Sequence, residues 1–323
     1  MPILCALASL RAYSTTETLT FAFLFCASLS LLMRKAFFQL HIAVLLAGFT
    51  GILGRLITLN EGLLVWYRLL FTVVILGFLS FLRRKNRPLS RNKILALSGV
   101  GVIAALHWVT FYASIKSANV SVALVCFSSI GFFTAIFEPL ILRHRMSIIE
   151  ILLGLLTIAG IYLIFHFDPR FKTGIIIGII SAFLGCLFPI LNRRLIQGTT
   201  SEDLTLYELS GGFLFLTLMM PVYLHFFPSN ALVPGWSDLG WLLVLSLFCT
   251  VIAFNLMTKA LTKISAFTVN LTYNLEPLYG IFLAFIVFRE DKSLQSSFYW
   301  GLSLIMLSIM IQTLLIYRKH RKI

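Results

Sequence analysis

Charged side chains are scarce in this sequence. Asp, Glu, Lys and Arg together make up 12% of its 323 residues, whereas soluble globular domains carry about 25%. Hydrophobic residues reach 59%, and the mean hydropathy is +0.96. So few charges cannot cover the surface of a water-soluble fold, and we expect most of the chain to lie in lipid.

The residue groupings of several enzyme and binding classes are also missing. The five cysteines are scattered, with no Cys-x-x-Cys pair or Cys/His cluster, which argues against a disulfide framework or a zinc site. The sequence contains no nucleotide-binding P-loop, no His-Glu-x-x-His and no Gly-x-Ser-x-Gly motif. We therefore expect no metal, no cofactor and no catalytic residue, and ATP-driven transport by this chain alone is disfavoured.

What the sequence does contain is a series of ten long apolar runs, separated by short polar gaps. Each approaches the roughly 20 residues that span a bilayer, and lipid forces such runs to be helical because it offers no partner to free backbone groups. We therefore expect an all-α integral membrane protein with ten transmembrane helices. The expected spans are Ala36–Thr58, Gly62–Leu82, Ile94–Ile115, Asn119–Leu142, Ser147–Phe165, Gly174–Leu191, Leu204–Leu224, Leu239–Met257, Ile264–Phe288 and Phe298–Tyr317.

Basic residues exceed acidic ones by 26 to 12, which gives a formal charge of +14. They occupy the gaps between apolar runs rather than one face or one tail, so nucleic acid is not an expected partner. Eighteen lie in one set of alternating gaps and six in the other. Because basic loops stay on the cytoplasmic side, we expect a multi-pass protein of the bacterial cytoplasmic (inner) membrane with its C-terminus in the cytoplasm.

Residues 1–35 precede the ten-helix unit and contain a short apolar run, Leu19–Met33. This extra N-terminal hydrophobic segment has three interpretations: the core of a signal peptide, an eleventh helix, or sequence upstream of a translation start at Met33. We assign no function to it.

The first five spans resemble the last five at a nearly constant register. Because five is odd, the second copy must enter the membrane upside down, which gives an inverted repeat with halves at residues 36–172 and 173–323. Two near-equivalent halves can expose a site between them to either side in turn. The matched pairs include Lys116 with Lys263, Gly154 with Gly301, Gly51 with Gly185 and Tyr67 with Tyr207.

Several stretches resemble the EamA-type transporters of the drug/metabolite transporter superfamily. They are Ala47-Gly48-Phe49-Thr50-Gly51, Trp66-Tyr67-Arg68, the run from Tyr112 to Val122, Glu276-Pro277 and Arg289-Glu290. The resemblance extends from about Ala36 to Tyr317. It implies export or exchange of small metabolites, amino acids or drugs. One departure is that Ile130 and Arg143 stand where the second copy has Pro277 and Glu290, so the halves have diverged.

Ionisable residues inside the membrane are costly, at about 2.5–3.5 kcal/mol on insertion scales, and mark candidate sites. Arg68 lies about 9 Å into the second span, and His107 lies at a comparable depth in the third. We expect them to line one chamber with Trp66, Tyr67 and Trp108 and to contact solute or a gate. The alternative is a structural pair with a carboxylate on another helix.

The ninth span carries the second candidate group. Asn270, Asn274 and Pro277 share one face, with Tyr273 and Glu276 on either side. Pro277 lacks an N–H and predicts a local break in the helix. Near the bilayer midplane, Glu276 could carry a proton or hold a cationic solute; the alternative role is hydrogen bonding between helices.

Tyr207 and Glu208 occupy in the seventh span the places that Tyr67 and Arg68 occupy in the second, with the opposite charge. They complete the candidate binding or gating residues. Glu150 lies nearer the inner surface, and we interpret it as structural.

The leading hypothesis is a secondary transporter that moves small organic metabolites by alternating access, with export as the favoured direction. Its partners would be a small-molecule solute and membrane lipid, with proton coupling, and the protein would be a monomer or a weak homodimer. A flippase for a lipid or an isoprenoid carrier is the alternative. An intramembrane enzyme with His107 and Glu276 as an acid–base pair is less favoured.

Overall fold

The computed structural model describes residues 16–83, 89–143, 145–167, 169–229, 231–261, 272–273 and 275–321. Helices are the regular secondary structure of this part of the chain. They are α2 (Thr16–Leu56), α3 (Glu61–Arg83), α4 (Arg91–Ser117), α5 (Val120–Phe127), α6 (Ile130–Leu142), α7 (Ile148–Phe167), α8 (Lys172–Leu195), α9 (Ser201–Phe226), α10 (Trp236–Ser246), α11 (Ala253–Leu261), α13 (Glu276–Phe288) and α14 (Ser296–Arg321), with the short turns η1 (Pro169–Phe171), η2 (Leu247–Ile252) and η3 (Glu290–Lys292).

Membrane-spanning segments account for most of this structure. Within the described ranges, seven helical segments are long and apolar enough to cross a membrane, by length and composition. Three shorter apolar helices, Ile148–Ile164, Glu276–Phe288 and Ser296–Gln312, fall on the remaining expected spans. The prediction of a ten-helix, all-α membrane protein is confirmed.

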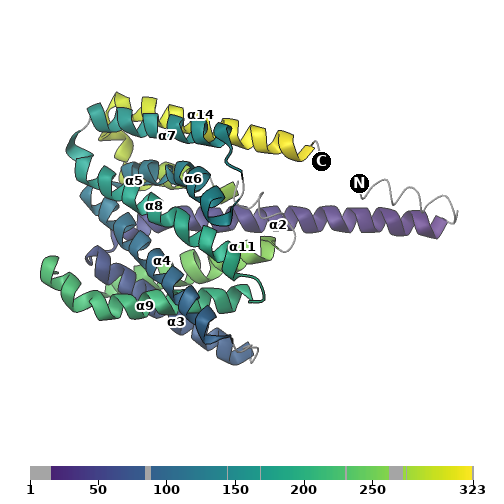
Figure 1. Cartoon of the computed structure of the whole chain (residues 1–323), viewed down its shortest axis with the longest axis horizontal. Coiled ribbons are helices and arrows are strands. Elements are labelled where there is room, and N and C mark those ends of the chain that lie inside the picture. Colours follow the sequence, from purple (N-terminus) through teal and green to yellow (C-terminus); the bar gives the residue numbers. More distant parts are fainter. Residues whose placement is uncertain are drawn as a thin grey trace.

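The largest contacts between helices repeat in the two halves of the chain. When two helices make such a contact, their counterparts in the other half also pack on each other. Helix α2 packs on α13 and α11, and its counterpart α8 packs on α6 and α4. Helix α3 packs on α10, and its counterpart α9 packs on α4. Counterparts also pack on each other, α3 with α9 at one edge of the bundle and α7 with α14 at the other (Figure 1). An internal two-fold axis produces this pattern, in agreement with the inverted repeat.

The fourth span is interrupted, although the sequence predicted one continuous helix over Asn119–Leu142. Helix α5 ends at Phe127 and α6 begins at Ile130. At the turn between them, the Cys126 carbonyl accepts the Ser129 N–H at 3.0 Å and the Ser129 hydroxyl at 2.7 Å. That carbonyl is then engaged by Ser129, and the regular ladder of hydrogen bonds is broken.

In the ninth span, helix α13 begins at the place equivalent to the start of α6. It starts at Glu276 with Pro277 in its first turn, and Leu275 before it lies in a turn, in agreement with the predicted break. Helices α6 and α13 both have 13 residues, and each ends on an arginine in the left-handed conformation, Arg143 (φ 58°) and Arg289 (φ 53°). The structural offset between them is therefore 146 residues. The pairing of Arg143 with Glu290 was wrong by one residue: Arg143 corresponds to Arg289, and Ile130 corresponds to Glu276.

The eighth span was expected as a regular helix over Leu239–Met257, but it contains a π-helical turn, η2, between α10 and α11. In this turn Thr250 donates its hydroxyl to the Leu245 carbonyl, five residues earlier, at 3.1 Å. Single π-helical turns inside α-helices are frequent at functional sites.

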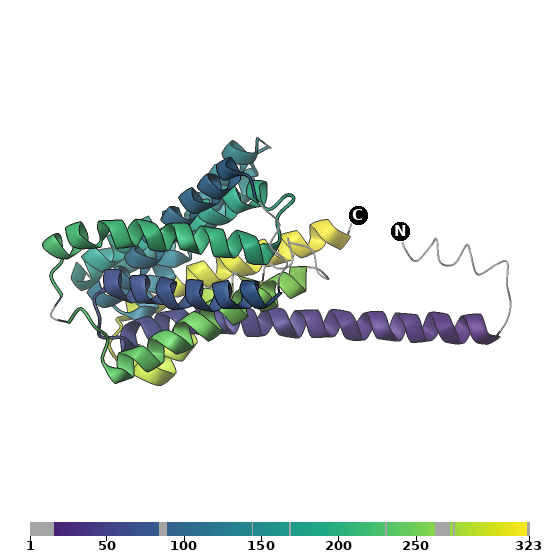
Figure 2. The ribbon, with the colours of Figure 1, turned by 90° about the horizontal axis from the view of Figure 1, so that it is seen from below.

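The N-terminal segment continues the first span. The backbone of α2 is helical over 41 residues, about 60 Å at 1.5 Å per residue, and it passes through Met33 without interruption. Its first half projects beyond the other helices (Figures 1 and 2). The helix is thus about twice as long as the roughly 30 Å hydrocarbon core of a bilayer.

Helices α7 and α14 touch backbone to backbone where they cross. A Cβ added to Gly160 would lie 2.6 Å from the Gly301 carbonyl oxygen, and one added to Gly301 would lie 2.4 Å from the Gly160 carbonyl oxygen. Only glycine fits at either position.

Candidate functional site

Arg68 lies in the interior of the bundle, where three helical segments meet. Its side chain is buried, and its Nη1 donates to the Tyr112 hydroxyl of α4 at 2.8 Å. Nε and Nη2 both donate to Thr250 Oγ1 of η2, at 3.2 and 3.1 Å. The guanidinium also stacks on Trp108, 3.8 Å from the ring centroid. Arg68 therefore joins the first repeat to the second.

The hydrogen bonds of Arg68 are made to neutral groups. Three of its five N–H donors are used by Tyr112 and Thr250, so two are left for another acceptor. Ser246 donates its hydroxyl to the Arg68 backbone carbonyl at 3.1 Å, which fixes α3 against α10. The cation is held in place without being neutralised by direct contact with an acid.

Glu276 provides the opposite charge from the second repeat. It begins α13 at the interruption of the ninth span, is partly buried, and interacts electrostatically with Arg68. Among the contacts of the described residues, no ion pair joins the two side chains. The helix has no side-chain N-cap, so the positive end of its dipole is also free. The Arg68 cation and the Glu276 carboxylate thus come from different repeats and interact electrostatically, with no ion pair between them among the described contacts.

His107 lies on the other side of α4. Its Nδ1 is 2.9 Å from the Ser181 carbonyl oxygen, which can only accept, so Nδ1 carries the proton. Ser181 in turn donates its hydroxyl to the His107 carbonyl at 3.0 Å. The aromatic rings of Phe111, Phe127 and Phe188 surround the imidazole. We expected Arg68, Trp108 and His107 to line one chamber. Arg68 and Trp108 are in contact, whereas His107 connects α4 to α8 through Ser181.

Trp66 and Tyr67 point toward α9 and the connection after it. Trp66 Nε1 donates to Thr217 Oγ1 at 2.9 Å, and the Tyr67 hydroxyl donates to the Leu232 carbonyl at 3.1 Å. Both residues position α3, and with it Arg68.

Glu208 is buried near the other end of the bundle. Its carboxylate accepts a hydrogen bond from Asn192 Nδ2 at 2.7 Å. The backbone of Gly101 lies so close that an added Cβ would be 1.7 Å from the Glu208 carbonyl oxygen. Tyr207 is partly buried beside it. These contacts place Glu208 in the packing of α4, α8 and α9.

The remaining predicted residues belong to the ninth span. Pro277 is buried at the start of α13, and Tyr273 packs against a small cluster that contains Leu40 and Val44 of α2. Asn270 and Asn274 lie outside the described residues.

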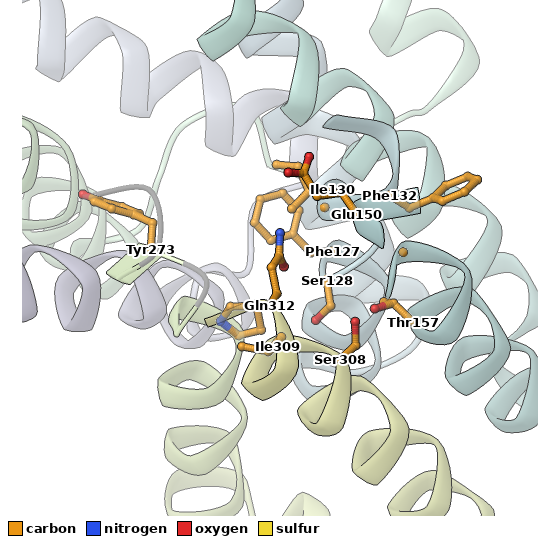
Figure 3. A pocket seen from close by; sticks show the side chains of 13 residues that line it. Phe127, Ser128, Ile130, Phe132, Glu150, Thr157, Tyr273, Ser308, Ile309 and Gln312 are labelled. Atoms are coloured by element: carbon orange, nitrogen blue, oxygen red, sulfur yellow. The ribbon is translucent and has the colours of Figure 1, made fainter. Parts of the chain in front are cut away.

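A cavity next to the interrupted helices was not anticipated from the sequence. It is small, partly open to the outside, and lies between α6, α7, α13 and α14 (Figure 3). It extends to Pro277, beside Glu276. Serine, threonine and glutamine are common in membrane helices, so the sequence did not distinguish the polar residues that line this cavity from others of the same type. Its lining is Phe127, Ser128, Ile130, Gly131, Phe132, Glu150, Gly154, Thr157, Tyr273, Pro277, Ser308, Ile309 and Gln312.

At the opposite end of the bundle, a buried carboxylate joins three helices. Glu290, 3% exposed, follows α13 and accepts the Val120 N–H at 3.1 Å and the Ser121 N–H and hydroxyl at 2.8 and 2.6 Å. It also pairs with Arg55 of α2. Nearby, Asp238 accepts the N–H and hydroxyl of Thr58 at 2.9 and 2.7 Å. We refer to these contacts of Arg55, Thr58, Asp238 and Glu290 as the end clamp.

The counterpart helices α8 and α6 are joined by a more exposed ion pair. Arg193 at the end of α8 pairs with Glu138 of α6, the counterparts of α2 and α13. Their side chains are 65% and 26% exposed, compared with 2% for Glu290. The carboxylate of the end clamp is therefore the more deeply buried of the two.

Comparison with known proteins identifies this arrangement. The model of the EamA-like transporter family matches the chain twice, over residues 34–166 and 172–314. This chain belongs to the EamA-like transporter family. The two matches correspond to the two five-helix repeats. Membership makes the chain a membrane transporter rather than an enzyme, and implies a small-molecule solute.

Two further likenesses agree with this assignment. A protein of Archaeoglobus fulgidus described as an uncharacterized transporter is 24% identical over 203 residues, which is 61% of this chain and 67% of that protein. A crystal structure described only as that of a protein superposes with a TM-score of 0.58 at 16% identity. That superposition covers 88% of this chain and 99% of the other, and it shows a shared fold.

Proposed function

We propose that this EamA-like transporter is a secondary transporter that exports a small organic solute across the cytoplasmic membrane by alternating access. The observation that carries the proposal is the electrostatic interaction between Arg68, held on α3, and Glu276, at the start of α13. They come from different repeats and interact electrostatically without an ion pair. Midplane sites beside interrupted helices, between two repeats, are a recurring design of such transporters.

The two charges have different roles in this proposal. Arg68 has two N–H donors left and a fixed planar fork, which suits a carboxylate or another anionic group of the solute. Glu276 lies at the start of a helix and can exchange a proton when the solute arrives or leaves. Proton coupling is therefore part of the proposal.

The structure supports a conformer that is closed at the end clamp. Glu290 and Asp238 tie α2, α5, α10 and α13 together there. The cavity that extends to Pro277 also has Glu150 in its lining. Glu150 lies in the first turn of α7, at the end of the bundle opposite to the end clamp. The excess of basic residues assigns that opposite end to the cytoplasm, so we infer a conformer that faces inward.

Flux into proteoliposomes tests the proposal. Solutes are first selected by comparing the metabolites of cells that lack or overproduce the protein. Their saturable flux is then measured with and without an imposed pH gradient. We expect Arg68→Gln to reduce flux at least tenfold, and Glu276→Gln to abolish the effect of the gradient.

Glu202→Gln, an exposed carboxylate in the first turn of α9, is the matched control and should behave as the native protein. Native flux in both Arg68 and Glu276 variants, or no flux of any selected solute, would contradict the proposal.

A further inference from the structure

The cavity between α6, α7, α13 and α14 has polar groups of an unusual kind. The ends of Ser128, Thr157 and Ser308 turn toward one another within it (Figure 3). The Ser128 hydroxyl donates to the Leu124 carbonyl at 3.1 Å. Those of Thr157 and Ser308 donate to the Leu153 carbonyl at 3.3 and 2.7 Å.

These internal bonds decide what the hydroxyls offer to a ligand. Each hydroxyl has one proton and two lone pairs, and in all three the proton is used on a main-chain carbonyl. The groups that face the cavity are then oxygen lone pairs. The cavity wall therefore offers hydrogen-bond acceptors at Ser128, Thr157 and Ser308.

A carboxylate completes the acceptor set. Glu150 lines the cavity in the first turn of α7, and within the described part of the chain its carboxylate has no hydrogen-bond or ion-pair partner. No Lys, Arg or His is among the described residues that line the cavity. Gln312 is the one amide, and Phe127, Ile130 and Ile309 supply apolar surface. Such a wall favours a cation that carries N–H donors over an anion or a neutral acceptor.

We propose that this cavity binds the ammonium group of a small amphipathic amine. Glu150 supplies the counter-charge, and the three hydroxyl oxygens accept the N–H bonds. The apolar part of the amine packs on Phe127 and Ile309. This inference rests on the proposed transport function, because it assigns the cavity as the place where such a solute is first held before it passes Pro277.

Binding to the purified full-length protein in detergent tests the inference without requiring transport. Isothermal titration compares three probes of the same shape: phenethylammonium, its N-trimethyl derivative, and neutral 2-phenylethanol. We expect phenethylammonium to bind tightest, because the trimethyl derivative keeps the charge but has no N–H donor. Glu150→Gln should weaken phenethylammonium two- to fivefold, because Glu150 is exposed and an exposed charge pair contributes up to about 1 kcal/mol.

Matched variants separate the cavity from general effects on the fold. Thr157→Val removes one acceptor of the cavity, whereas Thr134→Val removes a similar hydroxyl, bonded to the Ile130 carbonyl at 2.7 Å, outside its lining. We expect a two- to fivefold loss of affinity for the first and no change for the second. Gly131→Leu is a further test, because a Cβ on Gly131 meets nothing within 4 Å. The larger side chain should fill the cavity and abolish binding in a folded protein.

Equal binding of 2-phenylethanol and phenethylammonium would overturn the inference, as would native affinity in Glu150→Gln or in Gly131→Leu. Loss of binding in Glu276→Gln alone would place the ammonium elsewhere and also overturn it. Saturable flux without ammonium binding refutes this inference but not the proposed function. Ammonium binding without any flux refutes the proposed function but keeps the cavity as a binding site.

Discussion

Replacing Glu290 by Gln should open the end of the bundle that the end clamp closes. The carboxylate accepts bonds from Val120, Ser121 and Arg55 with two oxygens, whereas an amide has one oxygen and an NH₂ group. The NH₂ group must face a backbone N–H of α5, which leaves a buried donor unpaired. That costs about 1–3 kcal/mol, and the loss of negative charge at the start of α5 adds about 0.3–1 kcal/mol.

The Arg55 pair adds less than about 1 kcal/mol, because Arg55 is 41% exposed. The clamped form is then destabilised by roughly 2–4 kcal/mol relative to an open form that lacks these contacts. At 1.4 kcal/mol per factor of ten, the population of the open form rises about thirtyfold to several hundredfold.

The native Cys249 is a suitable reporter of this opening. It is a free cysteine, 5% exposed, on η2, and it interacts electrostatically with Arg68 and Glu276. With the other four cysteines replaced by serine, a membrane-impermeant thiol reagent is added from the clamp side. We expect Cys249 to react at least thirtyfold faster in Glu290→Gln than in the parent.

Glu138→Gln is the matched control, because it breaks the exposed ion pair at the opposite end. Exposed pairs contribute about 0–1 kcal/mol, so labelling should change fivefold at most. Equal rates in the two variants would show that Glu290 does not hold this end closed.

Two further predictions concern residues around the site. Tyr112→Phe removes the 2.8 Å hydrogen bond to Arg68. Solute flux in proteoliposomes should fall about fivefold or more through a higher KM. An unchanged KM would contradict the positioning of Arg68 by Tyr112. Gly101→Ala places a Cβ 1.7 Å from the Glu208 carbonyl oxygen and should prevent stable folding, whereas Gly99→Ala, whose Cβ meets nothing within 4 Å, should keep the native Tm in detergent.

The sequence predicted the spans and the repeat because both depend on composition and register, which local residues carry. The break in the ninth span was predictable because Pro277 has no N–H. The equivalent break at Ser128 and Ser129 was not, since serine pairs are tolerated in continuous helices. The one-residue error in pairing Arg143 arose because apolar matches at offsets of 146 and 147 are equally convincing.

The site was predicted only in part, for a similar reason. Depth in the membrane identified Arg68, His107 and Glu276 as candidates. We expected Arg68, Trp108 and His107 in one chamber, and Arg68 does contact Trp108. His107 instead lies against Ser181, because which helix covers each face of α4 depends on tertiary packing. The cavity acceptors were missed because the direction in which a hydroxyl donates depends on the carbonyl beside it.

The glycine crossing of α7 and α14 has a consequence for movement. At Gly160 and Gly301 each main chain rests directly on the other, with the side chains of Ile164 and Ile305 packed beside the contact, so the two backbones have little room to slide past one another at this point. If the repeats rock as proposed, we expect this crossing to act as the pivot, with displacement that grows with distance from it. Spin labels on α7 and α14 should keep a constant separation throughout a transport cycle, while labels on α3 and α9, at the far edge of the bundle, should travel furthest.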